Sequence, residues 1–190
     1  MITIVDYGAG NIRSVANAFE SLGMKTSVAD NGKAILQAER IVLPGVGAFG
    51  AAMRELDARA LIEPLKRKIR EGIPFLGICL GMQLLFTSSE ESPGVCGLNI
   101  IDGSCVRLTT ERVPNIGWCS TVDVRTGTIA MYYYVHSYAV VPSNSAVVTM
   151  IENTQGFCAG IHRDTVAGVQ FHPEKSGDAG IGFLRQWGAL

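Results

Sequence analysis

The first half of the chain alternates short unbroken apolar runs with stretches in which apolar residues recur at helical spacing. The apolar runs are Ile2–Asp6, Arg40–Leu43 and Phe75–Ile78. The helical stretches lie at 12–22, from Met53 to Ala60 and from Pro64 to Gly72, and from Leu80 to Phe86. Runs without alternation are typical of strands buried on both faces. This order of strand and helix predicts a parallel sheet covered by helices on both faces, with ligands at the carboxyl ends of its strands.

The second half of the chain has a different pattern of apolar and polar positions. After the polar residues 88–94, short β-rich runs alternate with turn residues from Leu98 to Val148. A hairpin is expected between Phe157 and Phe171, and apolar spacing at Ile181, Leu184 and Trp187 predicts a closing helix. The fold class expected is therefore α/β, an open and mostly parallel sheet with appended antiparallel strands.

Composition limits what the chain can do. It has 190 residues, 47% hydrophobic, and a net charge of -1, which suits one domain over 1–190 with a full core. This near-neutral charge gives no indication that the chain binds nucleic acid or an acidic membrane surface. No apolar run reaches the roughly 20 residues of a membrane span, and no signal peptide is expected. The five cysteines show no Cys-x-x-Cys spacing, so neither a metal site nor a disulfide framework is expected, and the cytoplasm is the default compartment.

Gly77-Ile78-Cys79-Leu80-Gly81 joins an apolar strand to a helical stretch. Gly-x-Cys-x-Gly is the cysteine counterpart of the nucleophile elbow, in which small flanking residues allow a strained central residue. The elbow would place the Cys79 sulfur at a helix N-terminus, where the dipole favours a thiolate. From this stretch alone, a buried core cysteine between two glycines is an equally good interpretation.

Phe171-His172-Pro173-Glu174 follows a second apolar strand. His172 is expected at the same sheet edge as Cys79, and Glu174 is placed to hold the far ring nitrogen of its imidazole. The two stretches together predict a nucleophilic triad of Cys79, His172 and Glu174. The glycine turn at Gly8 and Gly10 has Arg13 where a dinucleotide fingerprint has its third glycine, so no cofactor is expected.

These two motifs resemble those of the triad class of glutamine amidotransferases, whose fold is a flavodoxin-like open sheet. Further stretches are similar to the glutaminase subunits of imidazole glycerol phosphate synthase, and they run in family order over essentially the whole chain. They are Asp6–Asn11, Leu43–Phe49, Ser89–Glu91, Pro114–Trp118, Tyr132–Tyr138 and His172–Ser176. Where that family most often reads Gly-Trp-Asn, this chain has Gly117-Trp118-Cys119, which leaves the local partner contacts open.

The resemblance implies hydrolysis of L-glutamine to glutamate and ammonia through a thioester on Cys79. The oxyanion would be held by the N–H of Leu80 and by one N–H of the Val46-Gly47 peptide. Residues expected to bind the glutamine are Gly47, Gln83, Glu91, Ser137 and Tyr138.

The resemblance also implies a partner: a (β/α)8-barrel cyclase that receives the ammonia in histidine biosynthesis, forming a heterodimer. The residues expected at that interface are Asn11, Trp118 and Lys175. Two alternatives stay open at this point. One is the glutaminase of anthranilate or aminodeoxychorismate synthase, against which Asn11 and Lys175 argue, and the other is a non-catalytic scaffold on the same fold.

Overall fold

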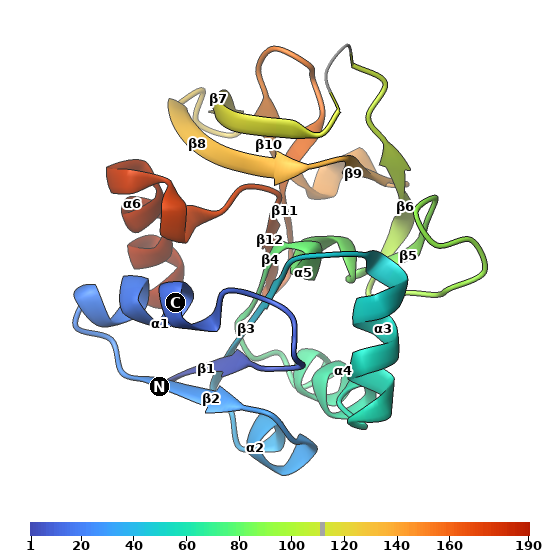
Figure 1. Cartoon of the computed structure of the whole chain (residues 1–190). Helices are drawn as coiled ribbons and strands as arrows, with labels where there is room; N and C mark the ends of the chain where they lie inside the picture. Colours follow the sequence, from blue (N-terminus) through green and yellow to red (C-terminus); the bar gives the residue numbers. More distant parts are fainter. Residues whose placement is uncertain (111–112) are drawn as a thin grey trace.

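The computed structural model describes residues 1–110 and 113–190, which form one 12-stranded sheet with helices on both faces (Figure 1). The main path of the sheet runs β2-β1-β3-β4-β12-β11-β10-β7-β8. Its first five strands are parallel, and they are β2 (Thr26–Ala29), β1 (Ile2–Val5), β3 (Arg40–Gly45), β4 (Phe75–Cys79) and β12 (Val166–Val169). The expected parallel sheet is therefore confirmed.

Beyond β12 the sheet continues with antiparallel pairings, except that β5 and β6 pair in parallel. Those on the main path are β11 (Cys158–Arg163), β10 (Val148–Glu152), β7 (Asn115–Asp123) and β8 (Ile129–His136). A side branch holds β5 (Phe86–Ser89), β6 (Ile101–Arg107) and β9 (Tyr138–Pro142), with β9 paired to β6 and to β11. Two short 3-10 turns complete this half, η1 (Ser145–Val147) and η2 (Pro173–Lys175).

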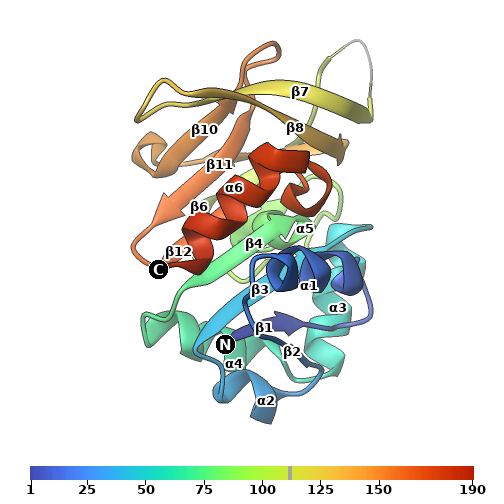
Figure 2. The same ribbon diagram turned by 90° about the vertical axis from the view of Figure 1, so that its left-hand side faces the viewer.

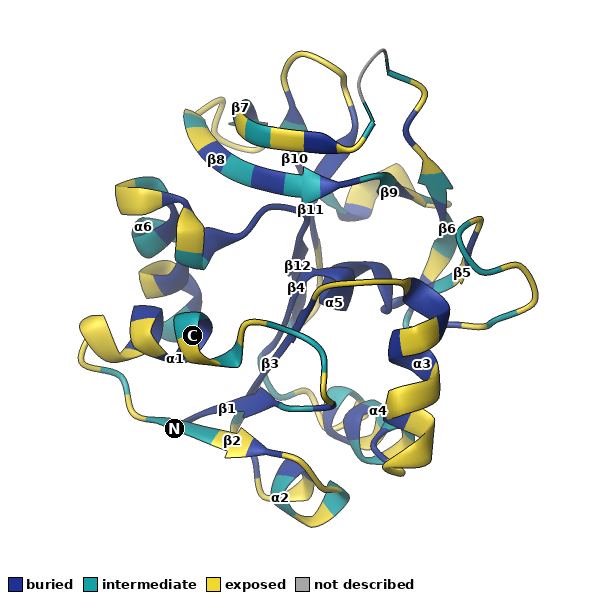
Figure 3. Ribbon diagram, in the orientation of Figure 1, coloured by how far each residue is buried: buried dark blue, intermediate teal, exposed yellow. Residues whose placement is uncertain are grey.

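The helices lie in two layers, one on each side of the parallel strands (Figures 1 and 2). One layer holds α1 (Ile12–Ser21) and α6 (Gly177–Gly188), and the other holds α2 (Gly32–Leu36), α3 (Phe49–Ala58) and α4 (Ile62–Arg70). Figure 3 shows β1, β3, β4 and β12 as buried along almost all of their length, whereas the edge strand β2 is partly exposed. Successive strand residues feed the two cores in turn: Ile41 and Leu43 pack under α3, whereas Val42 packs under α1.

The strand register brings the ends of the central strands together. Gly45 at the end of β3 pairs with Cys79 at the end of β4, and Val169 of β12 pairs with Ile78 on the other side of β4. The segments that follow β3, β4 and β12 therefore emerge side by side at one edge. This is the edge at which an open parallel sheet binds its ligands.

Three local expectations were wrong or incomplete. The helix expected from Leu80 to Phe86 is only α5 (Leu80–Gln83), and Phe86 begins β5 instead. The edge strand β2 was not predicted, because its half-exposed residues have no apolar run. The β-rich run 132–141 is divided at Ser137 into β8 and β9.

Candidate active site

Cys79 stands at the turn between β4 and α5 in a strained backbone conformation. Its φ of 55° and ψ of -110° are disfavoured for any residue with a Cβ. A side chain at Gly81 would overlap the carbonyl of Leu43, and a Cβ at Gly77 would lie 2.6 Å from the carbonyl oxygen of Gly81. The two glycines are therefore needed for the tight crossing of strand and helix, as expected for a nucleophile elbow.

The support expected from a helix dipole is small, however. The helix α5 has only four residues, so few peptide dipoles align behind the sulfur. Other groups must stabilise a thiolate at this position.

His172 follows β12 and lies with its ring next to Glu174. The Nδ1 atom of His172 is 2.8 Å from Oε1 of Glu174, and both side chains are almost completely buried. The backbone N–H of His172 donates to the carbonyl of Tyr133 (2.9 Å), and Ser176 Oγ donates to the carbonyl of His172 (2.6 Å). Strand β8 and the turn η2 thus fix the imidazole from both sides.

The electrostatics of His172 depend on its two partners. Burial alone would lower its pKa, but Cys79 and Glu174 together raise the pKa of His172 to about 10. Nε2 of His172 is buried, and among the residues that the structure describes it has no partner in hydrogen-bonding geometry. Cys79 and Glu174 therefore favour the protonated imidazole, in which Nε2 carries the N–H that does not face Glu174.

A pocket of about 290 Å³ opens above Cys79. It brings together every residue expected to hold the oxyanion or the glutamine: Val46, Gly47, Leu80, Gln83, Glu91, Ser137 and Tyr138. Residues 46–48 are exposed, and Gly47 has a φ of 102°, which few other residues tolerate. The pocket is thus bounded by a glycine-bearing loop on one side and by the ends of β8 and β9 on the other.

Two of these side chains have structural partners as well. Oε2 of Glu91 accepts a hydrogen bond from the N–H of Phe49 (2.7 Å), the first residue of α3. Gln83 Nε2 donates to the carbonyl of Tyr138 and to Oε1 of Gln170, both at 3.0 Å. Their remaining oxygen atoms are those available to a bound molecule.

Gln170 is a site residue that the sequence reasoning missed. It is fully buried two positions before His172, and its Nε2 lies 3.6 Å from the sulfur of Cys79. A polar residue inside the apolar run 166–171 was the available signal.

His136 also lines the pocket, but its ring is held by other protein groups. Its Nδ1 lies 2.9 Å from the carbonyl of Tyr138, and its Nε2 lies 3.1 Å from Nδ2 of Asn115. Burial lowers the pKa of His136 to about 4. It is therefore a neutral packing residue of the pocket wall at physiological pH.

The residues expected at a partner interface are exposed. Asn11 caps α1 by accepting a hydrogen bond from the N–H of Ser14, and Lys175 lies in the turn after His172. Trp118 is 53% exposed, and its indole meets the ring of Tyr133 edge-on, with centroids 6.1 Å apart. These observations are compatible with an interface role and leave it a prediction.

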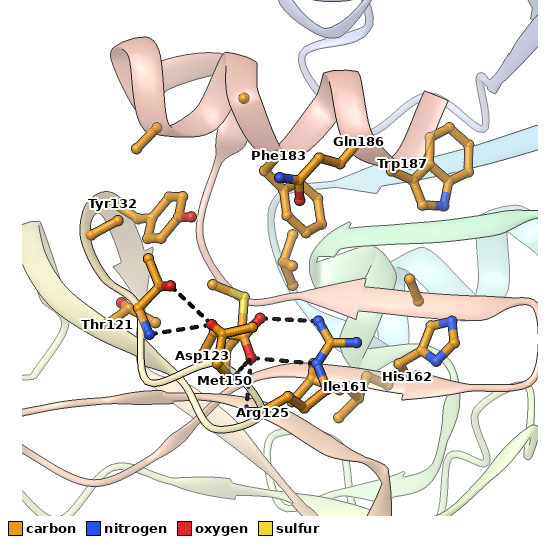
Figure 4. Close-up of a pocket in the computed structure, with 18 of the residues that line it drawn as sticks. Thr121, Asp123, Arg125, Tyr132, Met150, Ile161, His162, Phe183, Gln186 and Trp187 are labelled. Atoms are coloured by element: carbon orange, nitrogen blue, oxygen red, sulfur yellow. Dashed lines mark hydrogen bonds and ion pairs between the residues drawn. The ribbon is translucent and has the colours of Figure 1, made fainter. Parts of the chain in front are cut away.

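A larger cavity of about 570 Å³ lies away from Cys79, between α6 and the strands β10 to β12. In Figure 4, Phe183, Gln186 and Trp187 form its helical wall, and Asp123 forms an ion pair with Arg125 on the opposite side (3.0 Å). No cysteine lines this cavity, so the predicted chemistry belongs to the smaller pocket.

Within residues 1–110 and 113–190, no group of three His, Cys, Asp or Glu side chains is arranged to hold a metal ion. Over the same ranges, no helix has both the length and the apolar character needed to cross a membrane.

Comparison with known proteins agrees with the geometry. The glutamine amidotransferase class-I family matches residues 3–186. The chain is 44% identical to the imidazole glycerol phosphate synthase subunit HisH of Methanothermobacter thermautotrophicus, covering 98% of this chain and 97% of that protein. It is 43% identical to the HisH subunit of Syntrophotalea carbinolica over the full length of both.

Solved structures show the same fold at much lower identity. A crystal structure of a glutamine amidotransferase matches with a TM-score of 0.83 at 14% identity, covering all of both chains. The PurLQS structure from Thermotoga maritima matches with a TM-score of 0.76 at 18% identity, covering 100% of this chain and 98% of that one. By sequence and by fold, this chain belongs to the class-I glutamine amidotransferases and, within them, to the family of the HisH subunits of imidazole glycerol phosphate synthase.

Proposed function

We propose that this chain is a glutaminase, in which one domain over residues 1–190 hydrolyses L-glutamine to glutamate and ammonia. The observation that carries the proposal is a strained cysteine in the pocket wall that lies close enough to the buried His172–Glu174 pair to act on His172 electrostatically. A nucleophile, a proton carrier and an orienting carboxylate are the three parts that thioester chemistry needs.

In the proposed mechanism the Cys79 thiolate attacks the side-chain amide carbon of glutamine. The oxyanion that forms is stabilised by the N–H of Leu80 and by one N–H of the Val46-Gly47 peptide. His172, whose pKa is raised by Cys79 and Glu174, gives its proton to the departing ammonia. It then takes a proton from the water that hydrolyses the thioester, while Glu174 keeps the ring oriented.

The pocket suits glutamine in size and in chemistry. The free oxygens of Gln83 and Glu91 are acceptors for N–H groups of glutamine. Gly47 bounds the pocket on the loop side, and Ser137 with Tyr138 bounds it where the α-carboxylate would lie.

The ammonia requires a second protein, since free ammonia would be protonated and lost in water. The HisH relatives are named as subunits of imidazole glycerol phosphate synthase, which supports a cyclase partner of the (β/α)8-barrel type acting in histidine biosynthesis. We assign its docking face to the exposed residues Asn11, Trp118 and Lys175. The free thiols of all five cysteines fit a cytoplasmic enzyme.

Covalent labelling tests the proposal directly. A glutamine analogue with an electrophilic carbon in place of the amide should attach once per chain, at Cys79, and free glutamine should slow the reaction. The exposed Cys96 is the internal control, because it lies outside the pocket and should not compete. Labelling that ignores glutamine, or that occurs at another cysteine, would reject the assignment.

A further inference from the structure

The side-chain amide of Gln170 connects Cys79 with Gln83. Its Nε2 lies 3.6 Å from the sulfur of Cys79, and its Oε1 accepts a hydrogen bond of 3.0 Å from Nε2 of Gln83. Gln170 is fully buried and Gln83 is 5% exposed, so protein groups must satisfy these amides. The contact pattern therefore decides how both side chains are oriented.

The oxygen and nitrogen of a side-chain amide are often interchangeable by a half-turn of the group. Here the carbonyl of Tyr138 decides which atom of Gln83 is the nitrogen. The carbonyl oxygen of Tyr138 lies 3.0 Å from the end of Gln83, and a carbonyl can only accept. Gln83 must therefore present its NH2 group there. The same NH2 group meets Gln170, so Gln170 must present its oxygen to Gln83 and its NH2 group to Cys79.

The carbonyl of Tyr138, which sets the orientation of Gln83, is itself held in place. Tyr138 pairs with Arg107 in the ladder of β9 and β6. Its carbonyl also receives Nδ1 of His136 at 2.9 Å, which therefore carries the ring proton. The orientation of Gln170 is thus set by the backbone of β9.

We propose that Gln170 is a positioning residue with two effects: it supplies an N–H donor to the Cys79 thiolate and it holds the Gln83 amide with its oxygen toward the pocket. The first effect is needed because α5 is a single turn and because the carbonyl of Val135, 3.9 Å from the sulfur, suits the protonated thiol. The second follows because both N–H groups of Gln83 are occupied, which leaves its oxygen for a donor on the substrate. The effect on Gln83 rests on the proposed glutaminase function, whereas the effect on Cys79 does not.

The test is the rate at which iodoacetamide alkylates Cys79 near neutral pH, followed by mass spectrometry and divided by the rate at the exposed Cys96. Gln170→Met keeps the volume and removes both contacts, so this ratio should fall about tenfold, the value of one hydrogen bond to a charged group. Thr3→Val is the matched control, since Thr3 is 3% exposed on β1 and its hydroxyl contacts Ser27 at 3.3 Å. A residue that acts only in packing would lower the melting temperature without changing the alkylation ratio.

A second variant keeps the test decisive if Gln170→Met does not fold. In Gln170→Glu the protonated carboxyl can still donate to the sulfur, but the ionised form cannot. The alkylation rate relative to wild type should therefore decline as the pH rises from about 6 to about 9. Both proteins share the other titratable groups around the site, which are Tyr7, Glu91, His136, His172 and Glu174.

Steady-state kinetics with glutamine add a second readout. Gln170→Met should lower kcat and raise KM together, because it weakens the nucleophile and also frees Gln83. Alkylation of Cys79 does not depend on turnover. A wild-type chain that is inactive both alone and with the cyclase subunit would reject the proposed function, and the effect on Cys79 would still be judged by alkylation. A Cys79 to Cys96 ratio within about twofold of wild type in both variants would overturn the role of Gln170.

Discussion

At the scale of single residues, the backbone conformation that Cys79 needs for function lowers the stability of the fold. Its positive φ costs about 1–3 kcal/mol in a residue with a side chain, and glycine does not pay this cost. We expect Cys79→Ala and Cys79→Gly both to abolish glutamine hydrolysis, and the glycine variant to be the more stable of the two by about 1 kcal/mol. Urea unfolding of the pair measures the difference. Equal stability would mean that the elbow is not strained.

His172 makes stability depend on pH in a known direction. Burial opposes its charge, but Cys79 and Glu174 raise its pKa to about 10 in the folded chain, against about 6.5 in the unfolded one. The folded state binds this proton more tightly, so the stabilising contribution is complete below about pH 6.5 and is lost as the pH rises toward 10.

The comparison that isolates this effect is between the wild type and His172→Asn. The difference in their free energies of unfolding should shrink steadily over that pH interval. A constant difference would contradict a protonated resting His172.

At the scale of secondary-structure elements, Glu91 joins the pocket to a helix. The helix α3 begins after Ala48, which has no side chain able to accept a hydrogen bond, and the N–H of Phe49 donates instead to Glu91 from the β5 side. Glu91→Ala should therefore lower the free energy of unfolding by about 1–2 kcal/mol, in the range of a lost cap. Glu91→Gln keeps an acceptor oxygen and should cost less. If Glu91→Ala were as stable as wild type, the cap would have no energetic role.

Most of the elements that position the site could be predicted from sequence. Unbroken apolar runs revealed β1, β3 and β4, because strands buried on both faces need no polar alternation. The edge strand β2 and the early end of α5 could not be found in this way. Val28 in β2 is 54% exposed, and α5 ends at Gln83 because tertiary pairing of Phe86 with Ile101 overrides its helical spacing.

The site was predictable to the extent that its residues belong to local motifs. Cys79 has its flanking glycines, and Glu174 lies two positions from His172, so short stretches of sequence revealed them. Gln170 acts through Cys79, which is 91 positions away in sequence, and no local spacing connects the two. Only the pairing of β12 with β4 brings them together.

At the scale of the whole molecule, β8 connects the proposed docking face to the catalytic centre. Its residue Tyr133 contacts Trp118 through its ring, while its backbone carbonyl accepts from the N–H of His172 and its N–H donates to Ser176 Oγ. A partner that contacts Trp118 would therefore lie one residue away from the groups that hold His172.

We expect Trp118→Ala to weaken the complex by about 2 kcal/mol, as for a buried aromatic anchor at an interface, without destabilising the isolated chain. Titration of the labelled chain with the cyclase subunit measures the affinity. Val28→Ala is the matched control, because Val28 is equally exposed but lies on β2, at the opposite end of the sheet from β8. Equal affinities for the two variants would mean that Trp118 does not belong to the docking face.

We expect the site to become fully active only in the assembly. The loop 46–48 is exposed, and Gly47 allows its peptide to turn, so a partner that turns this peptide can supply the second oxyanion donor. One such donor contributes about 2.7–4 kcal/mol to catalysis, equivalent to a factor of about 10²–10³ in rate.

The most direct measurement is the steady-state release of glutamate and ammonia from glutamine by the purified chain, alone and with the cyclase subunit and its nucleotide ligand. We expect low activity alone, an increase of about a hundredfold or more in the complex, and none with Cys79→Ala in either condition. Full activity of the isolated chain that no partner changes would contradict the subunit function, and activity that survives Cys79→Ala would contradict the triad.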